Sequence, residues 1–481
     1  MSTNAWRRIV ALGVQCPSVK LADSKRIPLG WQAFALSPAD QGGASAVLHF
    51  PVTTVVEPTA WLRVTTAIDV REEVVVEATL AHSGALLGDF NILYSHPFQP
   101  FQIAIDSSAI EEAMRHGIRL RMTKGTSDIW LYGPDAAHPE YSGLQPHVLM
   151  GHRADVDAAF MQNLLSMNSF SPFGWLGGCV QDALWEMSQV GDSQAACALA
   201  QQLSAYLDVD KGIVFENTMT EPRDGTFSSI EDFLPFAAIV NLYPDHPAIK
   251  NALAYLKSKT NEQGMIVSWD ELTTEGCYTV AYPLAAIAVK MRDHVLAQCA
   301  VDQLRFRVQH LVEGATIFQR GSLTGHKAFA NWGRGVAWYL LGIIKTIALL
   351  KNTALVDDAA LAPLRAEFKR AVAQVCQWQS TSGVWSSFID RPDTGVDTST
   401  SAGIAAAIAW GVRCGELDST YLCKAAATHE ALQNYITPDG FLTHVSQINR
   451  GGEALQASSY RVMSQFGMGL LAQLACVLRG A

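Results

Sequence analysis

The sequence is poor in charge and lacks the motifs that mark several large enzyme classes. Only 17% of its 481 residues are charged and 49% are hydrophobic, a balance typical of a globular rather than a disordered or fibrous protein. The formal net charge is −10 and no basic stripe is present, which argues against a nucleic-acid-binding protein. No GxSxG elbow, P-loop, HExxH or dinucleotide-binding fingerprint occurs, so serine-hydrolase, nucleotide and zinc-protease chemistries have no support.

Cysteine pairs with redox or metal-binding spacing are also missing. The nine cysteines are odd in number, widely spaced and mostly embedded in apolar stretches, where a free thiol behaves as a small hydrophobic side chain. We therefore expect a reducing compartment, with neither a disulfide framework nor a structural zinc site. The histidines at 246, 294, 310 and 326 lack metal-ligand spacing, and we expect no metal and no organic cofactor.

No apolar run is long enough to indicate a membrane span or a secretion signal. The N-terminal stretch MSTNAWRRIVALGVQCPSV has two arginines but too short an apolar run for a signal peptide. The strongest apolar stretch, WYLLGIIKTIALL, is interrupted by Lys345 and is shorter than the roughly 20 residues that span a bilayer. The sequence thus predicts a soluble, cytoplasmic protein without membrane or nucleic-acid partners.

The chain is long enough for two or three domains, and its pattern changes near residue 150. Residues 1–150 contain short segments rich in β-branched and aromatic residues, separated by Pro, Gly, Asp and Ser. Their spacing favours an antiparallel, sandwich-like β domain, interrupted by one helical turn near SSAIEEAMRHG. We expect this domain to pack against the rest of the chain or to form a homo-oligomer contact, while a sugar-binding role stays open.

Residues 151–481 repeat one helical plan. Five segments begin with a glycine, continue through a short apolar run and a polar loop, and end in an Ala-rich helix. Polar-faced helices alternate with nearly all-apolar ones, which predicts an outer ring around an inner ring. The inner helices are predicted at about 172–190, 229–243, 275–291, 331–352, 397–414 and 459–478, and the outer ones at about 155–167, 193–207, 246–259, 293–312, 357–380 and 419–436. Six of each make a mainly α fold, a closed (α/α)6 toroid of six helical hairpins.

The polar loops before the inner helices are predicted to meet on one face of this toroid. All inner helices run in the same direction, so that face collects the partial positive charge of several helix N-termini and suits a carboxylate ligand. The alternative is a helical repeat that binds a peptide or a partner protein, although such solenoids usually stay open.

Carboxylates begin several of the inner helices. Glu231 and Asp232 open the second, Glu275 opens the third, and Asp397 opens the fifth and is followed by Ser399. Each acid alone is more readily explained as a helix cap, which stabilises a helix by about 1 kcal/mol. Acids at equivalent places in a ring nevertheless point into one cavity, and paired carboxylates are the usual general acids and bases for glycosides.

Tryptophans and an arginine lie in or beside the same loops. The tryptophans are Trp269, Trp332, Trp338 and Trp385, with Trp175 on the first inner helix. A tryptophan face stacks well on a sugar ring, although core packing explains about half of such positions equally well. Arg334 is a candidate for bidentate pairing with a uronate carboxylate, or for a structural salt bridge with one of the acids.

Four segments resemble the unsaturated uronyl hydrolases of glycoside hydrolase families 88 and 105, over roughly residues 160–480. NWGRGVAWYLLGI is similar to the W-G-R-(G/A)-N-G-W segment of these families, and DTSTSAGIAAAIAWGVRCGEL to their E-T-S-x-(T/S)-A segment. FGWLGGCVQDALWEMSQVGD resembles their first inner helix, and SSIEDFLPFAAIVNLY their L-D-D segment. The β region lies outside the resemblance.

The resemblance implies a hydrolase that removes a terminal, 4,5-unsaturated uronic acid from an oligosaccharide without a cofactor. An acid protonates C4 of the vinyl ether, water adds at C5, and the hemiketal opens and releases the aglycone. The general acid/base of the families aligns with Glu275 in TTEGCYT, and a second aspartate aligns with Asp232. The substrate-binding residues that we predict are Glu231, Trp269, Gln319, Arg320, Trp332, Arg334, Trp338, Asp397 and Ser399.

The sequence departs from the family pattern at several of these positions. Glutamate replaces aspartate at Glu275, residues 317–321 (IFQRG) replace an H-G-W-D segment, and Asp397 stands where glutamate is usual. These departures keep open an exo-acting β-glucuronidase for saturated glucuronides, with carboxyl groups about 5–5.5 or 6.5–9.5 Å apart. A carbohydrate-binding protein without activity is the third alternative, and it predicts that Glu275→Gln changes nothing measurable.

Overall fold

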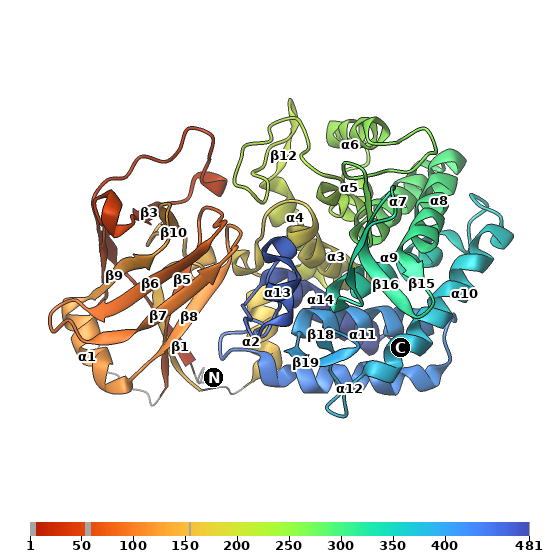
Figure 1. Ribbon diagram of the computed structural model, residues 1–481. Coiled ribbons are helices and arrows are strands. Elements are labelled where there is room, and N and C mark those ends of the chain that lie inside the picture. The colour runs from red at the N-terminus through yellow and green to blue at the C-terminus, as the bar shows by residue number, and fades with distance from the viewer. Residues whose placement is uncertain (1–5, 53–58, 153–154, 481) are drawn as a thin grey trace.

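A computed structural model describes residues 6–52, 59–152 and 155–480, and it divides into a strand-rich part and a helical part (Figure 1). The strands come first along the chain and the long helices follow. The two parts lie side by side, with the β part at the left of the view in Figure 1. A mainly α fold preceded by a β region is therefore confirmed.

The N-terminal part contains two antiparallel sheets and one further strand pair. Its strands are β1 (Trp6–Val10), β2 (Gly13–Gln15), β3 (Ala33–Leu36), β4 (Ala46–His49), β5 (Ala60–Thr65), β6 (Glu73–Leu80), β7 (Leu86–Leu93), β8 (Pro100–Ile105), β9 (Ile118–Lys124), β10 (Ile129–Tyr132) and β11 (His147–Gly151). The sheet orders are β1–β11–β5–β8 and β2–β4–β9–β6–β7, and β3 pairs with β10. Buried and half-buried residues alternate strictly along β6, as expected of a strand that turns one face to a core. The expected helical turn is α1 (Ser107–His116), capped by Asp106.

The C-terminal part is a double ring of helices. The inner ring consists of α3 (Trp175–Gln189), α5 (Phe236–Leu242), α7 (Tyr282–Met291), α9 (Gly333–Leu350), α11 (Thr398–Arg413) and α14 (Gln465–Arg479). The outer ring consists of α2 (Val156–Leu164), α4 (Ser193–Ser204), α6 (Pro247–Ser258), α8 (His294–Leu311), α10 (Asp358–Val375) and α12 (Leu422–Leu432). Helix α14 packs against both α11 and α3, so the last inner helix closes the ring on the first.

Three of the predicted inner helices begin later than the periodicity indicated. A 3-10 turn over Ile230–Phe233 precedes α5, and a π-helical turn over Cys277–Ala281 precedes α7. The sixth was predicted to begin at residue 459, but α14 begins at Gln465 and a short helix, α13 (Gly452–Ala457), precedes it. Apolar side chains in these irregular turns are buried as well, which is why the periodicity did not separate them from the helices.

Glycines allow the inner helices to approach one another closely. A Cβ atom on Gly469 of α14 would lie 2.5 Å from the Cys179 backbone of α3. A Cβ atom on Gly342 of α9 would lie 2.2 Å from the Cys277 backbone. No side chain fits at such distances, so the ring keeps this diameter only with glycine at both positions.

A buried ion cluster lies among the inner helices, where the charged Lys345 interrupts the apolar helix α9. Its ammonium group binds both Asp182 and Glu186 of α3, and all three side chains are at most 8% exposed. Tyr278 and Tyr282 donate their hydroxyl groups to Asp182 as well. Among the described helices α9 alone is long and apolar enough to cross a membrane, and 89% of it is buried inside the protein.

The β part is fixed to the toroid by a second buried ion cluster. Asp439, in the loop after α12, accepts hydrogen bonds from Arg63 of β5 at 2.6 Å and from Arg8 of β1 at 2.8 Å. Asp439 and Arg63 are completely buried. Burial opposes ionisation of Asp439, but Arg63 and Arg8 outweigh it and hold the pKa of this carboxyl well below its usual value.

Candidate active site

A cavity of about 460 Å³ lies among the loops that precede the inner helices. Its walls come from the start of α3, from the loops before α5 and α14, and from the hairpin of β16 (Thr316–Ser322) and β17 (Lys327–Ala330). The residues that line it are Trp175, Thr218, Glu231, Arg320, Phe329, Ile448, Asn449, Arg450 and Gly452. The cavity therefore brings together an acid, two arginines and two aromatic rings.

Glu275 lies beside this cavity and is held by the β16 strand. The side-chain amide of Gln319 donates to both carboxylate oxygens of Glu275, at 2.9 and 2.8 Å. Arg320 in turn donates to the amide oxygen of Gln319 at 2.7 Å, so the three side chains form a chain that ends at the cavity wall. Only 6% of Glu275 is exposed, and burial raises the pKa of its carboxyl, although the hydrogen bonds from Gln319 oppose that shift.

Glu231 is the acid that lines the cavity itself. Burial raises its pKa to about 8, and repulsion from Glu275 and Asp232 adds to the effect of burial. The positive charges of Arg450 and Arg320 act in the opposite direction. Glu231 and Glu275 thus repel each other when both are ionised, which favours one proton shared by the pair.

Asp232 occupies a different position from its neighbour Glu231. Its Oδ2 atom accepts hydrogen bonds from the backbone N–H groups of Ser228 and Ser229, at 2.8 and 2.9 Å, which completes a capping box. Burial raises the pKa of Asp232 to about 6 against these hydrogen bonds. The geometry therefore favours Glu231 over Asp232 as the partner of Glu275.

Comparisons with known proteins agree with this architecture. Residues 283–478 match the model of Glycosyl Hydrolase Family 88. The unsaturated rhamnogalacturonyl hydrolase YesR of Bacillus subtilis (strain 168) is 27% identical over 158 residues, which are 32% of this chain and 43% of that protein. A family 105 glycoside hydrolase of C. acetobutylicum ATCC 824 has a TM-score of 0.57 and 16% identity, covering 68% of this chain and 100% of that one. The unsaturated glucuronyl hydrolase of Bacillus sp. GL1 has a TM-score of 0.51 and 18% identity, covering 68% and 94%.

The fold is that of glycoside hydrolase families 88 and 105. The resemblance to these families and the toroidal fold predicted from the sequence are thereby confirmed. The chain spans less than half the length of the curated relative that it matches. The region that matches the family 88 model begins at residue 283, after Glu231 and Glu275, so the acids of the cavity are placed by the structure rather than by that match.

Arg334, predicted to pair with a uronate, is not among the residues that line the cavity of this family 88 and 105 fold. Its two terminal nitrogens donate to the backbone carbonyls of Ser446 and Gln447, each at 2.7 Å, and 1% of the side chain is exposed. Burial lowers its pKa to about 10. Arg334 therefore positions the 446–447 segment, and the arginines available to a ligand are Arg320 and Arg450.

Asp397 and Ser399 are likewise not among the residues that line the cavity. Asp397 caps α11, with Oδ1 accepting from the N–H and hydroxyl groups of Ser399 and Oδ2 accepting from Thr400. Burial would raise its pKa, but Arg334 and Arg461 hold the pKa below its usual value. Since both residues are fully buried, the structure assigns them to the helix cap rather than to a ligand.

The predicted tryptophans separate into three environments. Trp332 and Trp338 are at most 2% exposed, and Trp338 stacks on Tyr278 with ring centroids 5.7 Å apart, so both belong to the core. Trp269 is 92% exposed and lies in a different pocket. The aromatic rings on the cavity itself are Trp175 and Phe329. The sequence pattern does not mark Phe329 or Arg450, because a four-residue strand and a three-residue 3-10 turn are too short for a periodicity that shows the direction of a side chain.

The β part holds one wall of the cavity in place. Arg71 donates to the carbonyl of Thr218, a cavity residue, at 3.1 Å. Two residues further along the loop, the Thr220 hydroxyl donates to Asp69 at 2.7 Å, and Lys25 donates to the same carboxylate oxygen. Burial lowers the pKa of Arg450, Arg71 lowers it further and Asp69 opposes the shift, so the β part acts on the rim of the cavity.

Two further observations concern metals and thiols. Within residues 6–52, 59–152 and 155–480, no three His, Cys, Asp or Glu side chains come together as metal ligands would. All nine cysteines fall inside these ranges and are free thiols.

Proposed function

We propose that the protein is a glycoside hydrolase that removes a terminal, 4,5-unsaturated uronic acid from an oligosaccharide by hydrating its vinyl ether. The observation that carries this proposal is the acid pair of buried Glu275 and half-buried Glu231 beside a cavity that also presents Arg320 and Arg450. The name of the curated relative, an unsaturated rhamnogalacturonyl hydrolase, supports the same substrate class.

The cavity suits a uronate because two arginines line it beside one acid. Burial and the neighbouring acids raise the pKa of Glu231 to about 8, which favours its neutral form. Arg320 and Arg450 line the same space, and a guanidinium group recognises a carboxylate through two parallel hydrogen bonds. The rings of Trp175 and Phe329 supply flat apolar surfaces for the sugar.

In the proposed reaction the acid pair supplies the proton and takes it back. One proton shared by Glu231 and Glu275 is transferred to C4 of the unsaturated sugar, and positive charge develops at C5 beside the ring oxygen. Water adds at C5 and gives a proton to the carboxylate that remains, after which the hemiketal opens and releases the aglycone. Gln319 holds Glu275 in position through its two hydrogen bonds. We keep Glu275 as the general acid/base, place Glu231 where the sequence suggested Asp232, and invoke no metal or organic cofactor.

The test follows the ultraviolet absorbance of the C4=C5 double bond. Unsaturated disaccharides made by lyases from pectin and from glycosaminoglycans are incubated with the wild type and with Glu275→Gln. Loss of absorbance with the wild type only is the expected result. A wild type that leaves every such substrate intact would falsify the proposed hydration.

A second candidate is an exo-acting hydrolase for saturated β-glucuronides. The observation that favours it is the same acid pair, because two carboxyl groups across a sugar are sufficient for ordinary glycoside hydrolysis. Aryl β-glucuronides distinguish the two reactions, since only the second candidate releases the phenol from a saturated sugar. If neither class is consumed and Glu275→Gln binds oligosaccharides as the wild type does, the protein binds carbohydrate without catalysis.

We further propose that residues 1–150 and 151–481 are its two domains and that it acts in the cytoplasm. The nine free thiols support a reducing compartment. The contacts of Asp69 and Arg71 with the loop that carries Thr218 support a role for the β domain in shaping the cavity.

A further inference from the structure

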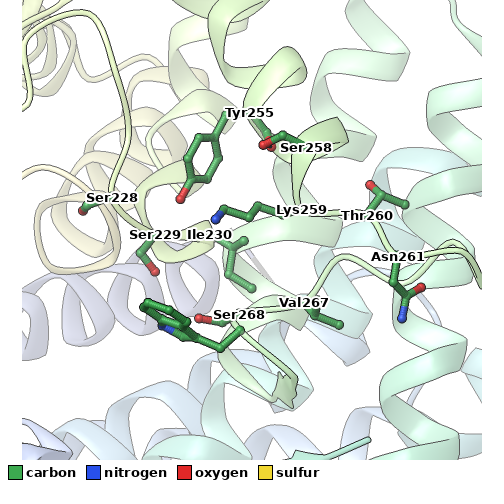
Figure 2. Close-up of a pocket in the computed structure, with 11 residues that line it drawn as sticks. Ser228, Ser229, Ile230, Tyr255, Ser258, Lys259, Thr260, Asn261, Val267 and Ser268 are labelled. Carbon is green, nitrogen blue, oxygen red and sulfur yellow. The ribbon is translucent and has the colours of Figure 1, made fainter.

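A second, smaller pocket lies outside the cavity and carries an exposed tryptophan. Its volume is about 260 Å³, and its walls come from the loop before α5, the end of α6 and the turn that precedes β14 (Glu271–Thr273). Figure 2 shows Tyr255 and Lys259 of the α6 end pointing towards Ser229 of the opposite loop. The Lys259 ammonium lies 5.3 Å from the centre of the Tyr255 ring, so the pocket combines aromatic surface with hydrogen-bond donors.

Trp269 forms one side of this pocket in an unfavourable conformation. Its indole is 92% exposed, and its φ of +57° lies in the left-handed region, which costs a residue other than glycine about 1–2 kcal/mol. A tight turn, closed by hydrogen bonds between Ser268 and Glu271 at 3.0 and 3.1 Å, holds it there. An exposed aromatic residue on a strained turn contributes little to the core, and such features cluster at ligand sites.

The pocket also contains a polar group that the fold leaves unused. Asn261 accepts two backbone hydrogen bonds through Oδ1, from Gln263 and Met265. Its side-chain amide nitrogen is buried and finds no partner in the part of the chain that the structure describes. Buried donors are nearly always satisfied in proteins, so this unpaired nitrogen is an exception in the wall of the pocket.

Two segments of the chain contribute residues to both the pocket and the cavity or its neighbours. Ser229 and Ile230 line the pocket, and the next residue, Glu231, lines the cavity. On the other side, β14 follows the Trp269 turn, and its Thr273 pairs with Arg320 of β16, which is a cavity residue. The pocket is therefore flanked by the two segments that carry the acid and an arginine of the cavity.

We propose that this pocket is an accessory subsite for a pyranose of the aglycone saccharide, stacked on Trp269. The proposal rests on the proposed function, because it places the terminal uronate in the cavity. The first aglycone sugar then lies at the cavity mouth, and a later sugar reaches Trp269. The faces of pyranose rings carry C–H groups that pack on an indole, while Lys259 and Ser229 offer partners to the ring hydroxyls.

Chain length of the substrate tests this subsite. Trp269→Ala is compared with the wild type on an unsaturated disaccharide and on an unsaturated tetrasaccharide from the same polysaccharide. We expect KM for the tetrasaccharide to rise by about tenfold, with kcat and the disaccharide kinetics unchanged. Trp269→Phe should restore most of the affinity. Val295→Ala, at a residue of outer helix α8 that is 78% exposed, is the surface control.

A binding measurement keeps this proposal separate from the proposed chemistry. Calorimetry measures the affinity of Glu275→Gln, with and without Trp269→Ala, for saturated and unsaturated tetrasaccharides. Weaker binding of the tetrasaccharides after loss of Trp269 supports the subsite even if no unsaturated substrate is hydrated. Equal losses on disaccharide and tetrasaccharide, an unchanged tetrasaccharide affinity, or no tetrasaccharide binding at all would each overturn it.

Discussion

Two pairs of carboxylates belong to the inner ring, and their surroundings differ. Among the inner helices, Asp182 and Glu186 share the ammonium group of Lys345, and two tyrosine hydroxyl groups donate to Asp182. At the cavity, Glu231 and Glu275 repel each other, and Arg320 and Arg450, whose charges oppose the pKa shift of Glu231, line the open space. Acids paired with a buried cation are out of reach of a ligand, whereas an acid at a cavity can exchange its proton with one.

The strongest test of this comparison removes the proposed general acid/base. We expect Glu275→Gln to lower kcat by about 10²- to 10⁴-fold, because proton transfer in the transition state is lost. The thermal midpoint should not fall. Burial disfavours the ionised carboxylate of Glu275 and raises its pKa, and a neutral amide avoids that cost. The measurement is initial rate by double-bond absorbance beside a melting curve. A large fall in the thermal midpoint would place Glu275 with the structural acids.

Disruption of the ion cluster of Lys345, Asp182 and Glu186 should instead lower the stability of the protein. Lys345→Met leaves Asp182 and Glu186 buried without their cation, which destabilises a protein by about 3–5 kcal/mol. Chemical denaturation measures the loss. Combining the change with Asp182→Asn and Glu186→Gln is the control, and it should recover much of the stability because no uncompensated charge remains.

Substitutions at the adjacent residues Glu231 and Asp232 test which of the two is the second catalytic acid. Glu231→Gln should lower kcat at least tenfold, because Glu231 lines the cavity and shares the proton. Asp232→Asn should instead lower stability by about 1 kcal/mol, because its carboxylate completes the capping box of the 3-10 turn. Initial rates and melting curves of both variants distinguish the catalytic acid from the structural one. The reverse pattern would restore Asp232 as the second catalytic acid.

The raised pKa of Glu231 predicts how stability depends on pH. Between the usual pKa of glutamate, 4.5, and about 8, the folded protein keeps a proton that the unfolded chain has released. The contribution of Glu231 to stability therefore falls as pH rises through this window and is constant outside it. Melting curves of the wild type and Glu231→Gln at pH 5 and pH 8 measure the difference. Identical pH dependence in the two proteins would contradict the shift.

The smallest expected effect concerns the β domain. Asp69→Asn weakens the contacts with Lys25 and Thr220 that hold the loop of Thr218. We therefore expect KM to rise several-fold, which corresponds to about 1 kcal/mol of binding free energy, with kcat nearly unchanged. Asp23→Asn is a matched control, because Asp23 forms an ion pair that is almost fully exposed. Equal kinetics for Asp69→Asn and the wild type would show that the β domain does not shape the cavity.

The sequence predicted the rings better than it predicted the cavity. Helices such as α9 are apolar on every side, and only a position inside a second ring of helices explains that pattern. The distinction between Glu231 and Asp232 depends on a 3-10 turn, in which neighbouring side chains point in different directions. Arg334 is buried with its donors on backbone carbonyls whereas Arg450 lines the cavity, and the spacing of residues carries no information about that difference.

The ion pair between Arg63 and Asp439 imposes an order on biosynthesis. The two residues are separated by 376 positions, so the β domain leaves the ribosome long before the counter-ion of its buried arginine is made. The ring likewise closes only when α14 reaches α3. Contacts this distant in sequence form late, and the unfinished ring exposes apolar helix faces while synthesis continues. The nascent chain should therefore depend on molecular chaperones until its last inner helix has been translated.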